Sequence, residues 1–91
     1  MSGEWDARKA TANLKKHRIS FEEASTVFLD PLAVTFPDPD HSAEEGREIT
    51  IGCTMRSQVV FVSHCERAGR IRIISARLAT RTEREQYEEE I

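Results

Sequence analysis

Two strand-like runs on either side of Gly69 constrain most strongly how this chain can fold. Residues 59–66 are rich in β-branched and aromatic side chains, and residues 70–77 are rich in isoleucine. A short turn that contains one glycine joins the two runs, which is typical of a β-hairpin. The sequence therefore predicts an antiparallel pair of strands in which side chains that lie opposite one another share a sheet face.

Side-chain pairing favours a three-residue hairpin loop over residues 67–69, with Gly69 in the left-handed region. A two-residue loop would place Arg67 opposite Arg70, and like charges directly opposite one another are unfavourable. A shift of one residue in register would also move whole sets of side chains to the other face. We therefore expect the three-residue loop.

This register gathers four polar side chains at one end of one sheet face. It pairs His64 with Arg72, and Glu66 with Arg70. Arg77 falls on the opposite face, so it would join the other arginines only if the strand twists or bulges near its end. The alternative is that these are ordinary cross-strand pairs on a solvated sheet face.

The first part of the chain shows two helix starts. Asp6 is a suitable N-cap for a helix that stops near His17. Ser20 and Glu23 form a capping box for a second helix, which Asp30 and the proline after it should end.

Two further strands and a last helix complete the expected fold. Residues 32–36 look like a short strand, and residues 48–55 alternate apolar and polar side chains as a half-buried strand does. Helix starts at Thr80 and Thr82 follow the hairpin. The order predicts a single α+β domain over residues 1–91, with two N-terminal helices, a four-stranded antiparallel sheet and a C-terminal helix.

Composition narrows the location of the protein. No apolar run approaches the length of a membrane span, and no signal peptide is recognisable at the start. Cys53 and Cys65 fit reduced thiols in the cytoplasm. We expect a cytoplasmic protein without a membrane partner.

The charge distribution favours a nucleic-acid partner despite a net charge of −3. Residues 56–84 contain seven arginines and only two glutamates. A local arginine cluster of this kind can bind phosphates even in an acidic chain, although a solvated surface with scattered charge is the simpler interpretation. Lys16, at the end of the first helix, and Arg81, in the last helix, are further candidates for binding RNA together with Arg70.

The residue types near the hairpin fit RNA cleavage without a metal. In that reaction a base takes the 2′-hydroxyl proton, the oxygen attacks the adjacent phosphate, and an acid protonates the leaving oxygen. His64 and Glu66 are candidates for proton transfer. Arg72, Arg77 and Arg70 would bind or stabilise the phosphate, because guanidinium groups offer planar, bidentate donors.

A metal site is the less favoured alternative. The loop of residues 37–46 is rich in acidic side chains, so a metal-dependent hydrolase is a rival hypothesis, but the loop lacks calcium-binding spacing. The two cysteines do not form a zinc-binding pair of the C-x-x-C type. We expect no metal and no cofactor.

Beyond these local patterns, the chain resembles the BrnT toxins of bacterial type II toxin–antitoxin systems over almost its whole length. The matching residues, in order, are Trp5-Asp6, Lys9, Asn13, Lys16-His17, ISFEEA (19–24), Val27-Phe28, Asp30-Pro31, DPDHS (38–42), ITIG (49–52), His64, Glu66-Arg67, RIISAR (72–77), Ala79-Thr80, Glu83-Arg84 and Tyr87.

The resemblance implies a compact RelE-like endoribonuclease that cuts RNA and halts translation. It also implies neutralisation by BrnA, a ribbon-helix-helix DNA-binding antitoxin, in a complex that represses its own operon, so that DNA is contacted only through the antitoxin. Some RelE-like nucleases use a tyrosine near the C-terminus, which makes Tyr87 a further candidate base beside His64 and Glu66. A rival from another class is an inactive partner-binding module that acts only in operon repression.

Overall fold

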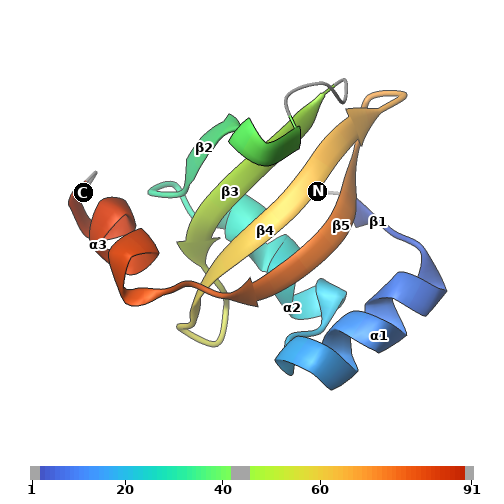
Figure 1. Ribbon diagram of the computed structural model, residues 1–91, viewed down its shortest axis with the longest axis horizontal. Helices are drawn as coiled ribbons and strands as arrows, with labels where there is room; N and C mark the ends of the chain where they lie inside the picture. Colours follow the sequence, from blue (N-terminus) through green and yellow to red (C-terminus); the bar gives the residue numbers. More distant parts are fainter. Residues whose placement is uncertain (1–2, 42–45, 90–91) are drawn as a thin grey trace.

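The computed structural model describes residues 3–41 and 46–89, which form an α+β fold (Figure 1). The elements in chain order are β1 (Gly3–Glu4), α1 (Ala7–His17), α2 (Phe21–Ser25), η1 (Thr26–Leu29), β2 (Val34–Pro37), η2 (Pro39–His41), β3 (Arg47–Cys53), β4 (Val59–Arg67), β5 (Arg70–Leu78) and α3 (Arg81–Glu89). The two N-terminal helices and the C-terminal helix lie where the sequence predicts them. None of the described helices is long and apolar enough to cross a membrane.

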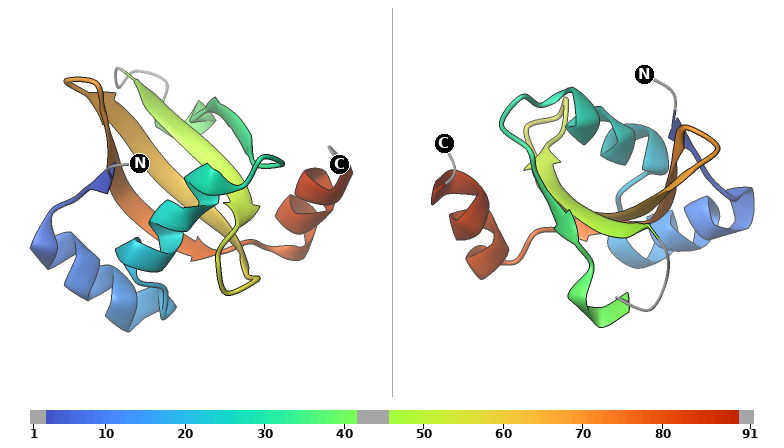
Figure 2. Two further views of the ribbon diagram at one scale, coloured as in Figure 1. Left: turned by 180° about the vertical axis from the view of Figure 1, so that it is seen from behind. Right: turned by 90° about the horizontal axis from the view of Figure 1, so that it is seen from above.

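The sheet separates two layers of side chains. Its strand order is β1-β5-β4-β3-β2. Helices α1 and α2 cover one face, which we call the inner face, and α3 lies beyond the other side of the sheet (Figure 2). The opposite, outer face is therefore covered only in part, at the end nearest α3.

The predicted four-stranded antiparallel sheet is wrong in one respect. The sheet has five strands and is mixed, because β1 pairs in parallel with β5 through Gly3 opposite Ile71 and Glu4 opposite Arg72. A strand of two residues has no alternation that a sequence pattern could reveal. The other three strand pairs are antiparallel, as expected.

Both N-terminal caps form as predicted. The Asp6 carboxylate accepts hydrogen bonds from the backbone N–H groups of Arg8 and Lys9, and the Ser20 hydroxyl accepts one from the N–H of Glu23. The second helix is shorter than expected, since it tightens into a 3₁₀ turn, η1, before it reaches Asp30.

The predicted hairpin loop is also wrong, because the loop has two residues rather than three. Arg67 lies opposite Arg70, and Ala68 and Gly69 between them have φ angles of 51° and 77°. Two positive φ angles in a two-residue loop are the mark of a type I′ turn, whose twist matches that of the strands. Both arginines are exposed at the tip, where water and salt weaken their repulsion.

A β-bulge in β5 then changes which residues share a face. Ser63 pairs with Ser75 whereas His64 pairs with Ile73, so Ile74 has no partner on β4. On either side of this extra residue the strand is regular. The bulge therefore brings Arg72 and Arg77 onto the same face of the sheet.

The inner face holds the larger apolar core. Phe21, Ala24 and Val27 recur at helical spacing and are fully buried. They pack against Val60, Val62, Ile73 and Ala76 of the sheet. The Trp5 ring meets Phe21 edge-on, at 5.9 Å between ring centroids.

A buried amide ties α1 to the edge of the sheet. The side chain of Asn13 accepts a hydrogen bond from the Ala76 N–H and donates to the Ala76 and Ile19 carbonyls. It thus satisfies backbone groups of β5 where the two-residue β1 no longer covers them.

The outer face holds a second core under α3. Ile49 and Ile51 pack there with Tyr87, whose hydroxyl donates a hydrogen bond to the Asp30 carboxylate at 2.7 Å. Asp30 also accepts from the backbone N–H groups of Leu32 and Cys53. One carboxylate therefore joins the start of β2, the end of β3 and α3.

Candidate active site

His64 belongs to the inner core. It is 4% exposed, its Nε2 lies 2.7 Å from the Thr50 hydroxyl oxygen, and its ring meets Phe28 edge-on at 5.0 Å. Burial lowers the pKa of His64 to about 4, because the charged imidazolium would lose its hydration. The predicted pairing with Arg72 is wrong, since the two-residue loop places His64 opposite Ile73.

The predicted pair of Glu66 and Arg70 is not formed either. Glu66 lies opposite Ile71, and Arg70 lies opposite Arg67 at the hairpin tip. Glu66 and Arg70 are both exposed. The structure thus disperses the four side chains that the three-residue loop would have brought together.

Among the predicted arginines, Arg77 contacts both an aromatic ring and a carboxylate. Its guanidinium carbon lies 3.9 Å from the centroid of the Phe61 ring, directly across from it on β4. Its Nη1 and Nη2 donate to the two carboxylate oxygens of Glu83, at 2.7 and 2.9 Å. The hydrogen bond to Glu83 raises the pKa of Arg77, and the same contact lowers the pKa of Glu83.

The turn into α3 fixes Glu83 in this position. Thr80 and Glu83 form a reciprocal capping box, in which the Glu83 N–H bonds to the Thr80 hydroxyl and the Thr80 N–H bonds to the Glu83 carboxylate. The sequence predicts this cap but not its second role, because a capping glutamate carries no sign that it also meets an arginine on the preceding strand.

The outer face beside this pair has a floor of small hydroxyl side chains bordered by arginines. Ser63 and Ser75 lie opposite one another, between the level of Arg77 and the level of Arg72 along the strands. Arg47 approaches from β3 and donates from Nε to the Ser63 hydroxyl at 3.3 Å. Three arginines therefore surround a shallow, hydroxyl-lined area, which can bind a phosphate group.

Acidic side chains partly balance these charges. Arg72 lies 3.9 Å from the Glu4 carboxylate, and the Arg47 Nε lies 3.8 Å from Asp38. Asp38 also contacts the imidazole Nδ1 of His41 at 2.9 Å.

The residues of the outer face described so far form one set, which we call the arginine surface. It consists of Arg47, Phe61, Ser63, Arg72, Ser75, Arg77 and Glu83.

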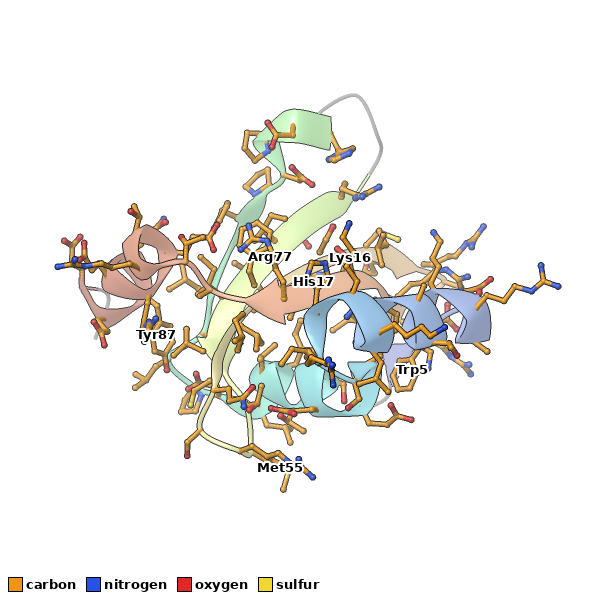
Figure 3. All side chains as sticks on the ribbon, turned by 60° about the horizontal axis from the view of Figure 1, so that its bottom comes forward. Trp5, Lys16, His17, Met55, Arg77 and Tyr87 are labelled. Atoms are coloured by element: carbon orange, nitrogen blue, oxygen red, sulfur yellow. The ribbon has the colours of Figure 1, made fainter. Side chains whose placement is uncertain are left out.

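The remaining predicted binding residues lie on the first and last helices. Arg81 is on α3, where its Nε contacts Glu85 at 3.2 Å. Lys16 is exposed in the last turn of α1, and Figure 3 shows it beside His17, well apart from α3 and Tyr87. Burial and the hydrogen bond to Asp30 raise the pKa of Tyr87 to about 12, as an anchor for α3 requires.

Metal-binding groups and disulfides are not found in the part of the chain that the structure describes. Cys53 and Cys65 are free thiols. No group of three histidine, cysteine, aspartate or glutamate side chains among residues 3–41 and 46–89 is placed to hold a metal. Part of the acidic loop of residues 37–46, on which the metal hypothesis rested, lies outside the described residues.

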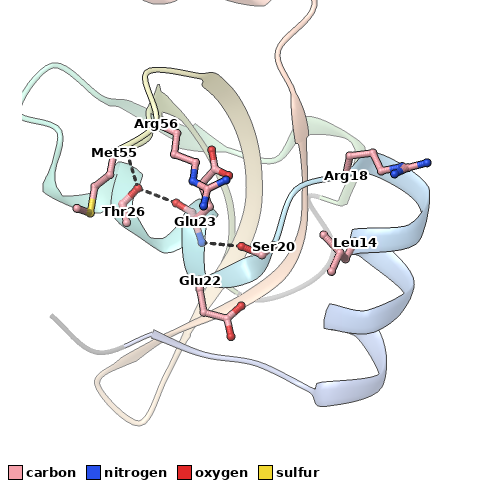
Figure 4. Close-up of a pocket in the computed structure, with 8 residues that line it drawn as sticks. All are labelled: Leu14, Arg18, Ser20, Glu22, Glu23, Thr26, Met55 and Arg56. Atoms are coloured by element: carbon pink, nitrogen blue, oxygen red, sulfur yellow. Dashed lines mark hydrogen bonds between the residues drawn. The ribbon is translucent and has the colours of Figure 1, made fainter.

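A pocket on the helix-covered side of the sheet contains none of the predicted site residues (Figure 4). It lies between α1, α2 and the β3–β4 turn, and Leu14, Arg18, Glu22, Met55 and Arg56 are among its lining residues. Opposite charges alternate around it, so it is a weaker phosphate site than the arginine surface.

Comparison with known proteins agrees with this architecture. A family model described as the ribonuclease toxin BrnT of type II toxin–antitoxin systems matches residues 5–83. The crystal structure of the Brucella abortus ribonuclease toxin BrnT superposes with a TM-score of 0.68 and 21% sequence identity, over 89% of this chain and 100% of the other. A search of curated proteins gives no match.

The family match spans both N-terminal helices, strands β2 to β5 and the capping box that carries Glu83. The structural match shows that the fold is shared as well. The chain therefore belongs to the BrnT family, the ribonuclease toxins of type II toxin–antitoxin systems.

Proposed function

We propose that this protein is a metal-independent endoribonuclease that cuts RNA, inhibits translation and is neutralised by a BrnA-type ribbon-helix-helix antitoxin. Membership of a ribonuclease toxin family supports the reaction class. The arginine surface supports its location on the molecule. It lies on the side of the sheet that α1 and α2 leave open.

The observation that carries the proposal is the position of Arg77. Stacking on Phe61 and the contact with Glu83 hold its guanidinium plane in one orientation at the surface. A fixed cation stabilises the charge that develops on phosphate oxygens without having to reorganise during the reaction. Arg72, on the same face, is placed to bind a neighbouring phosphate of the RNA chain.

The two other predicted catalytic residues fit the proposal unequally. His64 is enclosed by Thr50, Phe28 and the inner core, so an RNA strand on the outer face does not reach its ring. Glu66 is exposed near the hairpin tip, where it remains available to contact RNA, but it has no arginine opposite it.

Growth and RNA integrity after induced expression test the proposal. Wild type should arrest growth and degrade RNA, and cleavage of purified RNA should persist in excess chelator. Arg77→Ala should abolish both effects. Arg56→Ala removes the same charge from the exposed β3–β4 turn and serves as the matched control, which should stay toxic. An inert wild type, or an inert chelated enzyme, would contradict the proposal.

A second candidate function is an inactive module that only binds the antitoxin and supports operon repression. The burial of His64 and the engagement of Arg77 by Glu83 favour it, since both remove groups expected to be free in a nuclease. It predicts that wild type and Arg77→Ala bind the antitoxin equally and that neither cleaves RNA.

A further inference from the structure

The guanidinium of Arg77 offers two edges, and they are used differently. The edge formed by Nη1 and Nη2 holds Glu83, and Nη1 also donates to the Leu78 carbonyl. The other edge consists of Nε–H and the second N–H of Nη2. No described residue accepts a hydrogen bond there, so this edge is available to a phosphate while Glu83 stays in place.

Glu83 also keeps an acceptor position. Its Oε1 accepts from Arg77 Nη1 and from the Thr80 N–H, whereas Oε2 accepts only from Arg77 Nη2 among the described residues. A carboxylate oxygen can accept two hydrogen bonds, so Oε2 has one position left. The side chain of Glu83 is 20% exposed, so the carboxylate is not sealed from solvent.

A phosphate bound to the free edge of Arg77 would lie beside the Glu83 carboxylate. One N–H of Nη2 donates to Oε2 of Glu83, and the other N–H of the same nitrogen would donate to a phosphate oxygen. Two acceptors that are each about 2.9 Å from one nitrogen lie roughly 5 Å apart. A 2′-hydroxyl that attacks the bound phosphorus fits between them.

We propose that Glu83 is the general base of the RNA-cleaving reaction and that Arg77 holds it beside the scissile phosphate. This inference rests on the proposed ribonuclease function. Glu83 Oε2 takes the 2′-hydroxyl proton, the 2′-oxygen bonds to phosphorus, and the bond from phosphorus to the 5′-oxygen breaks. The leaving 5′-oxygen takes a proton from water, and Glu83 returns its proton to solvent. The products are a 2′,3′-cyclic phosphate and a 5′-hydroxyl.

The other candidate bases fit this geometry less well. His64 lies on the inner face and the Tyr87 hydroxyl bonds to Asp30, so neither borders Arg77. Glu66 is exposed beside the hairpin tip, at the far end of β4 from Phe61. Glu83 is the carboxylate that contacts the stacked arginine directly.

Steady-state cleavage of a short single-stranded RNA, in chelator, tests the inference. Glu83→Gln should lower kcat by about 10²–10⁴-fold with KM little changed, because a base acts on the chemical step. Glu83→Asp should retain part of the activity. Glu85→Gln makes the same change two residues along α3, at another arginine-paired glutamate, and should match wild type.

Folding and pH distinguish a base from a structural role. Thermal unfolding should show that each variant is folded. If Glu83→Gln does not fold, Glu83→Asp, which keeps the carboxylate, takes its place in the comparison. Wild-type kcat should stay level as the pH falls to about 5 and decline only below the ordinary glutamate range. Glu83→Gln should lack that decline at every pH at which circular dichroism shows both proteins to be folded.

Three results would overturn the inference while leaving the ribonuclease function intact. The first is a kcat of Glu83→Gln equal to that of Glu85→Gln. The second is an effect on KM alone, which would make Glu83 a positioning residue for Arg77. The third is a rise in activity, which would mean that Glu83 blocks the phosphate site. A wild-type protein that leaves RNA uncut would instead overturn the proposed function itself.

Discussion

Acid should destabilise this protein through His64. The imidazole is neutral and buried against Thr50 and Phe28, and burial lowers its pKa from 6.5 to about 4. The unfolded chain binds a proton below pH 6.5, whereas the folded chain resists binding one until about pH 4. Folding stability from this group is therefore complete above pH 6.5 and is lost as the pH falls toward 4.

The size of the effect follows from the two pKa values. One pH unit corresponds to 1.36 kcal/mol, so His64 alone should remove about 3 kcal/mol from the free energy of unfolding between pH 7 and pH 4. That is a large part of the stability of a small domain, which is about 5–15 kcal/mol.

Urea unfolding followed by circular dichroism, at pH 7 and at pH 4, measures this loss. His64→Gln does not titrate and can keep a hydrogen bond to Thr50, so the wild type should lose about 3 kcal/mol more than the variant over this range. The carboxylates titrate in both proteins and cancel in the comparison. Equal pH dependence in the two proteins would show that His64 is accessible to protons, and the inner-core assignment would then fail.

Three further changes test the contacts that hold the fold together. Tyr87→Phe removes the hydrogen bond to the Asp30 carboxylate and should lower the free energy of unfolding by about 1.5–3 kcal/mol in urea melts. Asn13→Ala leaves the N–H and carbonyl of Ala76 without their partner and should lower it by about 2 kcal/mol or more, with faster amide exchange in β5. Ala68→Asn should raise the melting temperature slightly, since asparagine tolerates the positive φ of this turn better.

The parts of the fold with strong local signals can be predicted from the sequence. Capping residues such as Asp6 and Ser20 act on backbone groups two or three positions away, so their effect is visible in a short window of sequence. The strands of the hairpin alternate or carry β-branched residues over long runs. In contrast, β1 pairs only two residues, and its partner strand lies almost seventy residues away in sequence.

The register of the hairpin shows why the site was harder to predict. The like charges of Arg67 and Arg70, which face each other, seemed to exclude a two-residue loop. Exposure at the tip makes that repulsion weak, so the twist of the turn decides the loop length instead. The bulge at Ile74 then reverses the face of every later residue in β5. These two local features set which residues lie opposite one another and brought Arg77 to the face of Arg72, and neither has a sequence signature. His64 is buried for another reason, because the N-terminal helices cover the face of β4 that it shares with Val62.

The contact between Arg77 and Glu83 shows a different limit. The capping box at Thr80 predicts where α3 begins, and a helix start placed just after a strand end would bring its third residue back toward that strand. Only the turn geometry decides which strand residue it meets. The charge pattern indicated phosphate binding by this segment, but it could not select Arg77 and Glu83 from the other arginines and glutamates.

Binding of a non-cleavable RNA tests the central claim most directly. A short RNA with 2′-O-methyl groups lacks the attacking hydroxyl, and its titration can be followed by NMR at each backbone amide. The account predicts saturable shifts at Phe61, Ser75, Arg77 and Glu83, which Arg77→Ala abolishes. Shifts confined to the pocket around Leu14 and Arg56, or no binding at all, would contradict the placement of the ribonuclease site on the arginine surface.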